Sequence, residues 1–89
     1  MNQTEDDKNF IRSNIPALLL APKVKSKTGE IAGEWKLLND EIPHCHSTSK
    51  NIEFTVFLLN GDRWIKVTAK INRDTAKFSN IETWTSNEL

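Results

Sequence analysis

A chain of 89 residues is expected to form one domain with a thin core, because a domain of this size buries only about 60–65% of its unfolded surface. Twelve basic and twelve acidic side chains cancel, which argues against a dedicated binder of nucleic acid or anionic membranes. The longest apolar run, residues 15–21, is too short to span a bilayer. The acidic N-terminus does not resemble a signal peptide, and the single cysteine excludes an intrachain disulfide. We therefore expect a single soluble, cytoplasmic domain over residues 1–89.

The N-terminal residues are predicted to form a short helix. Residues 1–9 are polar and acidic, so we expect them to be frayed or to form its first turn. Phe10 and Ile15 fall on one helical face. Pro16 should end the helix, because the residue before a proline avoids helical backbone. The helix is therefore expected over about residues 5–14.

The following segment suits either of two structures. A run of three leucines would continue a helix, but Pro22 removes a backbone donor and Val24 lies between two lysines in an alternating pattern. Gly29 then provides a turn residue that tolerates positive φ. The pattern favours a hairpin with strands near residues 18–26 and 31–38.

Residues 39–51 are rich in Ser, Thr, Asn and Pro, and they are predicted to form a long loop. The loop contains one cluster of metal-ligand types, His44, Cys45 and His46. The two histidines fall on the same side of an extended chain, but zinc requires at least three protein ligands and the chain has no further Cys or His. These three residues are therefore only weak candidates for a metal site, and we expect no cofactor.

Residues 52–71 are predicted to form a β-hairpin closed by Asn-Gly. A type I′ turn with Asn60 and Gly61 at its centre would place Val56 opposite Ile65. The same register would place Phe57 opposite Trp64. Alternation sends one set of apolar side chains to a single side of the hairpin, namely Ile52, Phe54, Val56, Ile65, Val67 and Ala69.

The C-terminal segment is ambiguous between helix and strand. Phe78, Ile81 and Trp84 are spaced by three residues, which suits a helix over residues 76–86, whereas the threonines at 75, 83 and 85 favour a strand. We favour a last strand that carries a bulge. The predicted fold is therefore α+β, with one short N-terminal helix and an antiparallel meander of about five strands, as an open sheet or a small barrel.

The second side of the hairpin carries an aromatic pair, Phe57 and Trp64, together with Lys66 and Lys70. A solvated sheet surface does not usually carry two large aromatic side chains, so something must cover them. The pattern favours cover by the N-terminal helix. The alternatives are an interface with another protein or a second copy, and a stacking platform for nucleic-acid bases.

No catalytic constellation or phosphate-binding loop is present in the sequence, and the carboxylate pairs fall in predicted loops. We therefore expect a non-enzymatic module that binds another protein or a second copy of itself as a homodimer. The second hypothesis is a small barrel that binds single-stranded nucleic acid. The predicted contact residues are Phe57, Arg63, Trp64, Lys66 and Lys70, with Trp35 as a further member.

Overall fold

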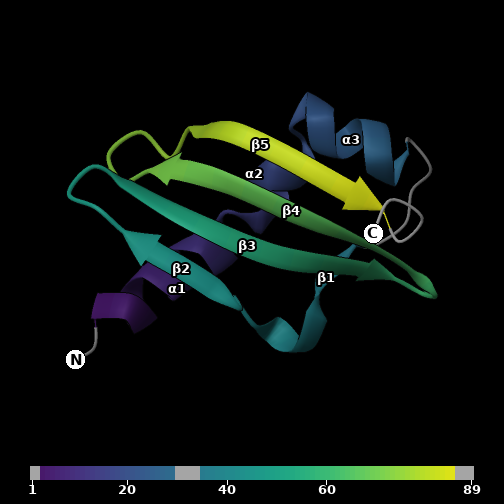
Figure 1. Cartoon of the computed structure of the whole chain (residues 1–89), viewed down its shortest axis with the longest axis horizontal. Coiled ribbons are helices and arrows are strands. Elements are labelled where there is room, and N and C mark those ends of the chain that lie inside the picture. The colour runs from purple at the N-terminus through teal and green to yellow at the C-terminus, as the bar shows by residue number, and fades with distance from the viewer. Residues whose placement is uncertain (1–2, 30–34, 86–89) are drawn as a thin grey trace.

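The computed structural model describes residues 3–29 and 35–85, and it shows helices followed by an antiparallel sheet (Figure 1). The predicted α+β class is confirmed, and the sheet is open rather than closed into a barrel. The elements in chain order are α1 (Gln3–Ser13), α2 (Ile15–Leu19), α3 (Pro22–Thr28), β1 (Lys36–Leu37), the 3-10 turn η1 (Leu38–Asp40), β2 (His44–Ser47), β3 (Asn51–Asn60), β4 (Arg63–Asn72) and β5 (Phe78–Thr85).

The N-terminal region is helical over a longer stretch than the sequence pattern predicts. The helix predicted over about residues 5–14 is confirmed as α1, which ends at Ser13 before Pro16. The chain then resumes a helix in α2, because Pro16 lies in its first turn, where a missing backbone N–H breaks no helical hydrogen bond. Pro22 occupies the same kind of position in α3. The predicted strand near residues 18–26 is therefore wrong. Gly29 does adopt positive φ, at 79°, but it ends α3 instead of closing a hairpin.

The sheet is built around the two long strands β3 and β4. β5 pairs with β4, while β1 and β2 both pair with β3, at different points along its outer edge. The strand predicted over residues 31–38 is present only as β1, and its earlier part lies outside the described residues. The predicted loop over residues 39–51 contains β2, which alternates between exposed and half-buried side chains as it pairs with β3.

The turn of the main hairpin differs from the predicted one. Asn60 pairs with Arg63, so the two central residues are Gly61 and Asp62. Gly61 has φ of 62°, which suits the first central position of a type II′ turn. The predicted pairs are therefore wrong: the strand partner of Val56 is Val67. The shift is two residues along the partner strand, so each side chain stays on its predicted side.

The predicted last strand with a bulge is confirmed in β5. Thr68 pairs with Glu82 and Lys70 pairs with Ser79, so β5 has one residue more than β4 over this interval. Asn80 lies in the bulge with φ of 52°. Such a bulge reverses the side to which the following residues point relative to an unbulged strand.

The helices cover the face of the sheet opposite to the predicted one. In Figure 1, α1 and α2 pass behind the sheet. The predicted cover of Phe57 and Trp64 by the N-terminal helix is wrong, because the helical apolar residues pack with the other side of β3 and β4. The buried apolar core consists of Ile11, Ile15, Leu18, Val24, Trp35, Ile42, Ile52, Phe54, Val56, Leu58, Ile65, Val67, Ala69 and Ile71.

Candidate functional site: the open face of the sheet

The face of the sheet turned away from the helices is the candidate site, and we call it the open face. Side chains alternate between the two sides of a strand, so the residues between core positions belong to this face. The strand register arranges them in rows across the sheet. The first row is Lys36, Leu59 and Trp64; the second is Phe57, Lys66 and Trp84; the third is His44, Thr55, Thr68 and Glu82; the fourth is His46, Glu53, Lys70 and Ser79.

The first two rows contain an apolar hollow. It has a volume of about 250 Å³ and is lined by Leu38, Phe57, Leu59 and Trp64. Phe57 and Trp64 are diagonal neighbours, and their rings meet edge to face with centroids 5.8 Å apart. This geometry is favourable for an aromatic pair. Leu38 is 39% exposed, so part of the apolar wall is in contact with water.

Leu38 reaches the hollow from a turn with unusual backbone geometry. Asn39 and Asp40 have φ of 54° and 55°, in the left-handed region that costs a non-glycine residue about 1 kcal/mol or more. Arg12 of α1 donates a hydrogen bond from Nε to the backbone carbonyl of Asp40 at 3.0 Å. The turn is therefore fastened to α1, and it places Leu38 at the wall of the hollow.

Trp84 belongs to the open face, although it is not among the predicted contact residues. Its ring lies 5.2 Å from the Lys66 ammonium group, within cation–π range. An unbulged strand would place Phe78 and Trp84 on the same side, but Phe78 packs against the core while Trp84 pairs with Lys66. The bulge at Asn80 accounts for this difference. Assigning Trp84 to the open face requires the exact position of the bulge, and the sequence does not show that position.

The structure brings together only part of the predicted contact set. Phe57, Trp64 and Lys66 are neighbours on the open face. Arg63 lies on the alternate side, in step with the core residues of β4, and its guanidinium group stacks 5.6 Å from the ring of the buried Trp35. Simple alternation along β4 would have separated Arg63 from Trp64 at the sequence level.

The third and fourth rows form a polar part of the open face. A second hollow of about 350 Å³ lies there, and its lining includes His44, Thr68 and Glu82. Lys70 also lies in this part, where its ammonium group is 3.4 Å from a carboxylate oxygen of Glu53. Both side chains are partly exposed, so the ion pair contributes little to stability. The predicted contact residue Lys70 is therefore separated from the apolar hollow.

The His-Cys-His cluster lies on β2 and is divided between the two sides of the sheet. His44 and His46 share the open face, as the alternation predicts, whereas Cys45 packs against the core. Burial raises the pKa of the Cys45 thiol. Within residues 3–29 and 35–85, no group of three or more His, Cys, Asp or Glu side chains could hold a metal ion.

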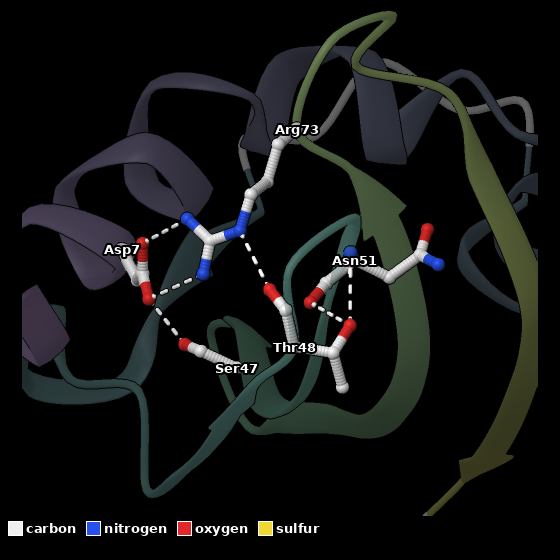
Figure 2. A network of polar contacts seen from close by, with 5 residues as sticks. All are labelled: Asp7, Ser47, Thr48, Asn51 and Arg73. Atoms are coloured by element: carbon white, nitrogen blue, oxygen red, sulfur yellow. Dashed lines mark hydrogen bonds and ion pairs between the residues drawn. The ribbon is translucent and has the colours of Figure 1, made fainter.

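A buried ion pair holds α1 against the sheet, as Figure 2 shows. Arg73 donates to both carboxylate oxygens of Asp7, at 2.6 and 2.9 Å, and its Nε donates to the carbonyl oxygen of Thr48. The Ser47 hydroxyl also donates to Asp7. The hydrogen bonds from Arg73 are the largest effect on the pKa of Asp7 and lower it, while burial opposes them. This network connects α1 to β2 and to the turns that follow β2 and β4, and it is separate from the open face.

Comparisons with known proteins give no relative: no protein-family model, curated protein or solved structure matches the chain. No helix in the described parts of the chain is long and apolar enough to cross a membrane. Function is therefore inferred from the chemistry of the open face.

Proposed function

We propose that this protein is a non-enzymatic module that binds another protein through the apolar rows of its open face. The observation that supports the proposal is the hollow between Leu38, Phe57, Leu59 and Trp64, which lies opposite the helices. Apolar and aromatic side chains gathered in a solvent-accessible patch are typical of protein interfaces. A protein in the cytoplasm is the partner class that we favour, with a second copy of this chain as the alternative occupant.

The hollow is suited to one large apolar side chain. Its four lining side chains are apolar or aromatic, and the indole N–H of Trp64 is the one hydrogen-bond donor among them. A charged or strongly polar group placed there would therefore lose more hydration than the lining can replace. Protein interfaces commonly depend on a few anchor side chains that fill such pockets. The polar rows beside it, with His44, Thr55 and Thr68, provide hydrogen-bonding groups of the kind found at an interface rim.

Single-stranded nucleic acid is a less well supported partner. Base stacking requires accessible aromatic faces, but the Lys66 ammonium group lies over the ring of Trp84 and the Phe57 ring meets Trp64. The lysines that would contact phosphates are few, and Lys70 already pairs with Glu53. The barrel expected for that function is also absent, because the sheet is open.

Site-specific photo-crosslinking tests the proposal. A photoreactive phenylalanine analogue would replace Leu38 in the full-length protein expressed in its native host. The matched control places the analogue at Leu20, which is 68% exposed and does not line the hollow. We expect a discrete crosslinked species from position 38 that protease removes and nuclease does not. A nuclease-sensitive product, or equal products from both positions, would contradict the proposal, and a species of twice the chain mass would indicate a second copy.

A further inference from the structure

We propose that Asn60 is a site of spontaneous deamidation, at which the side-chain amide is converted to a carboxylate. Asn60 is the one asparagine of the chain that precedes a glycine. The reaction begins when the backbone nitrogen of the following residue attacks the side-chain amide carbon of the asparagine. A glycine at that position has no Cβ to obstruct the attack. This chemistry is independent of the partner that the open face binds.

The fold leaves Asn60 beyond the reach of the strands that flank the main hairpin. β1 reaches β3 only as far as Leu59, and β5 reaches β4 only as far as Ile65. The strand partner of Asn60 is Arg63 alone, and the tip of the β3–β4 hairpin projects from the sheet in Figure 1. Strand ends of this kind open locally at much lower cost than global unfolding. The backbone at Asn60 can therefore reach the conformation that the reaction requires.

Both reacting groups are available. Within the described residues, the Asn60 side chain has no hydrogen-bond partner, and the N–H of the exposed Gly61 donates no backbone hydrogen bond. A two-residue hairpin turn leaves the N–H of its first central residue outside the ladder. Asn72 differs, because its side-chain oxygen accepts hydrogen bonds from the backbone N–H groups of Asp74 and Thr75. The amide of Asn72 is held in place, whereas that of Asn60 is free to turn towards the Gly61 nitrogen.

The reaction needs no reactant other than water. The Gly61 nitrogen forms a bond to Cγ of Asn60 and the bond from Cγ to Nδ2 breaks, so that Nδ2 leaves as ammonia with the proton from Gly61. One water molecule then opens the succinimide ring that has formed. Attack of water at Cγ gives aspartate, whereas attack at the backbone carbonyl carbon gives isoaspartate, in which the main chain runs through Cβ and Cγ. Neither step oxidises or reduces the protein.

The isoaspartate product should open the end of the hairpin. It inserts one methylene group into the main chain of β3 at the position that pairs with Arg63, and strand pairing depends on the regular spacing of backbone groups. It also places a new carboxylate close in sequence to the exposed Asp62, and like charges repel. The adjoining strand pair is Leu59 with Trp64, and both line the apolar hollow. Deamidation would therefore alter the end of the open face that carries the hollow.

Peptide mapping of aged protein tests the proposal. The full-length folded protein is incubated in mildly alkaline buffer, where backbone amide nitrogens ionise more readily, and is digested with trypsin beside an unaged sample. Cleavage after Lys50 and Arg63 gives a peptide of residues 51–63 that contains both Asn51 and Asn60. We expect the mass gain of deamidation in this peptide from the aged sample. Fragmentation should place the gain at Asn60 and identify part of the product as isoaspartate.

Matched variants assign the site. Asn60→Gln should remove the mass gain, because glutamine would have to close a larger ring and reacts far more slowly, whereas Asn51→Gln should leave the gain unchanged. Thermal melting confirms that both variants are folded. A synthetic peptide of residues 51–63, which lacks the rest of the sheet, sets the incubation time. The proposal is overturned if the folded protein shows no gain when this peptide has been converted, if the gain lies at Asn51, or if Asn60→Gln retains it.

The isoaspartate form, purified by chromatography, tests the structural consequence. Asn60→Asp is the matched control, because it carries the same added charge on an unaltered main chain. The isoaspartate form should have a lower thermal midpoint than Asn60→Asp. Equal midpoints would show that the end of the hairpin tolerates the longer main chain, and they would overturn the opening of the hairpin while leaving Asn60 as the deamidation site.

Discussion

Arg73→Ala should lower the free energy of unfolding by about 2–4 kcal/mol, because it leaves the buried Asp7 carboxylate without its cation. The Asp7 side chain is 5% exposed and accepts two hydrogen bonds from the guanidinium group. Removing one partner of a fully buried pair costs about 3–5 kcal/mol. The range expected here is lower, because the Arg73 side chain is 25% exposed and Ser47 still donates to the carboxylate.

Urea denaturation at pH 7, followed by circular dichroism, measures this loss. Arg12→Ala is the matched control: Arg12 is also 25% exposed, but its carboxylate partners Glu5 and Asp40 are 57% and 85% exposed. Exposed ion pairs contribute little, and the hydrogen bond from Arg12 to the Asp40 carbonyl contributes about 1 kcal/mol, so this control should lose about 1 kcal/mol, clearly less than Arg73→Ala. Equal losses in the two variants would refute the argument that burial of the Asp7 carboxylate determines the cost.

The pH dependence provides a second check of the same ion pair. The pKa of Asp7 is lowered in the folded protein, chiefly by the hydrogen bonds from Arg73. A carboxyl of this kind stabilises the fold above its unfolded pKa, about 3.9 for Asp, and the contribution is lost as the pH falls through the folded pKa. The stability difference between wild type and Arg73→Ala should therefore shrink as the pH falls below about 4. A difference that stays constant down to pH 2 would contradict this account.

Three further predictions concern single residues. Phe54→Ala should lower the free energy of unfolding, measured by urea denaturation, by about 3–5 kcal/mol, because Phe54 is 1% exposed in the core. Phe57→Ala on the open face should lower it clearly less, and the reverse order would contradict the assignment of the two faces. Gly61→Ala should lower the free energy of unfolding by about 1 kcal/mol or more, because φ of 62° is unfavourable for alanine. Thermal melting should show a lower midpoint, and an unchanged midpoint would contradict this turn geometry. Cys45 should react with iodoacetamide more slowly than free cysteine at neutral pH, because burial raises its thiol pKa. Mass spectrometry of timed samples measures the rate, and a rate equal to that of free cysteine would contradict this expectation.

The alternation along β3 and β4 was sufficient to assign side chains to faces. Val56, Val67 and their neighbours are buried together, and Phe57 lies with Trp64 on the other side, despite the wrong turn prediction. The reason is that strand side chains repeat every two residues, so a two-residue error in register leaves each face intact. The turn itself was not predictable, because Asn-Gly and Gly-Asp both provide favourable hairpin turns.

The helical region shows where local pattern was misleading. Val24 alternates with lysines as in a strand, yet it is a buried residue of α3. A short helix is stabilised mainly by packing of its apolar face against other elements, and its intrinsic preference contributes little. Pro22 lacks a backbone donor and therefore argues against the interior of a helix, but it lies at the start of α3, where proline is favourable.

The sequence by itself determined the α+β class, the two faces of the central hairpin and the grouping of Phe57, Trp64 and Lys66, because these depend on short-range periodicity. Only the tertiary structure decided which face the helices cover, where the bulge turns Trp84, and how the η1 turn brings Leu38 to the hollow. These features depend on contacts between residues far apart in the chain, and their energies are set by packing of the whole domain and not by any local segment.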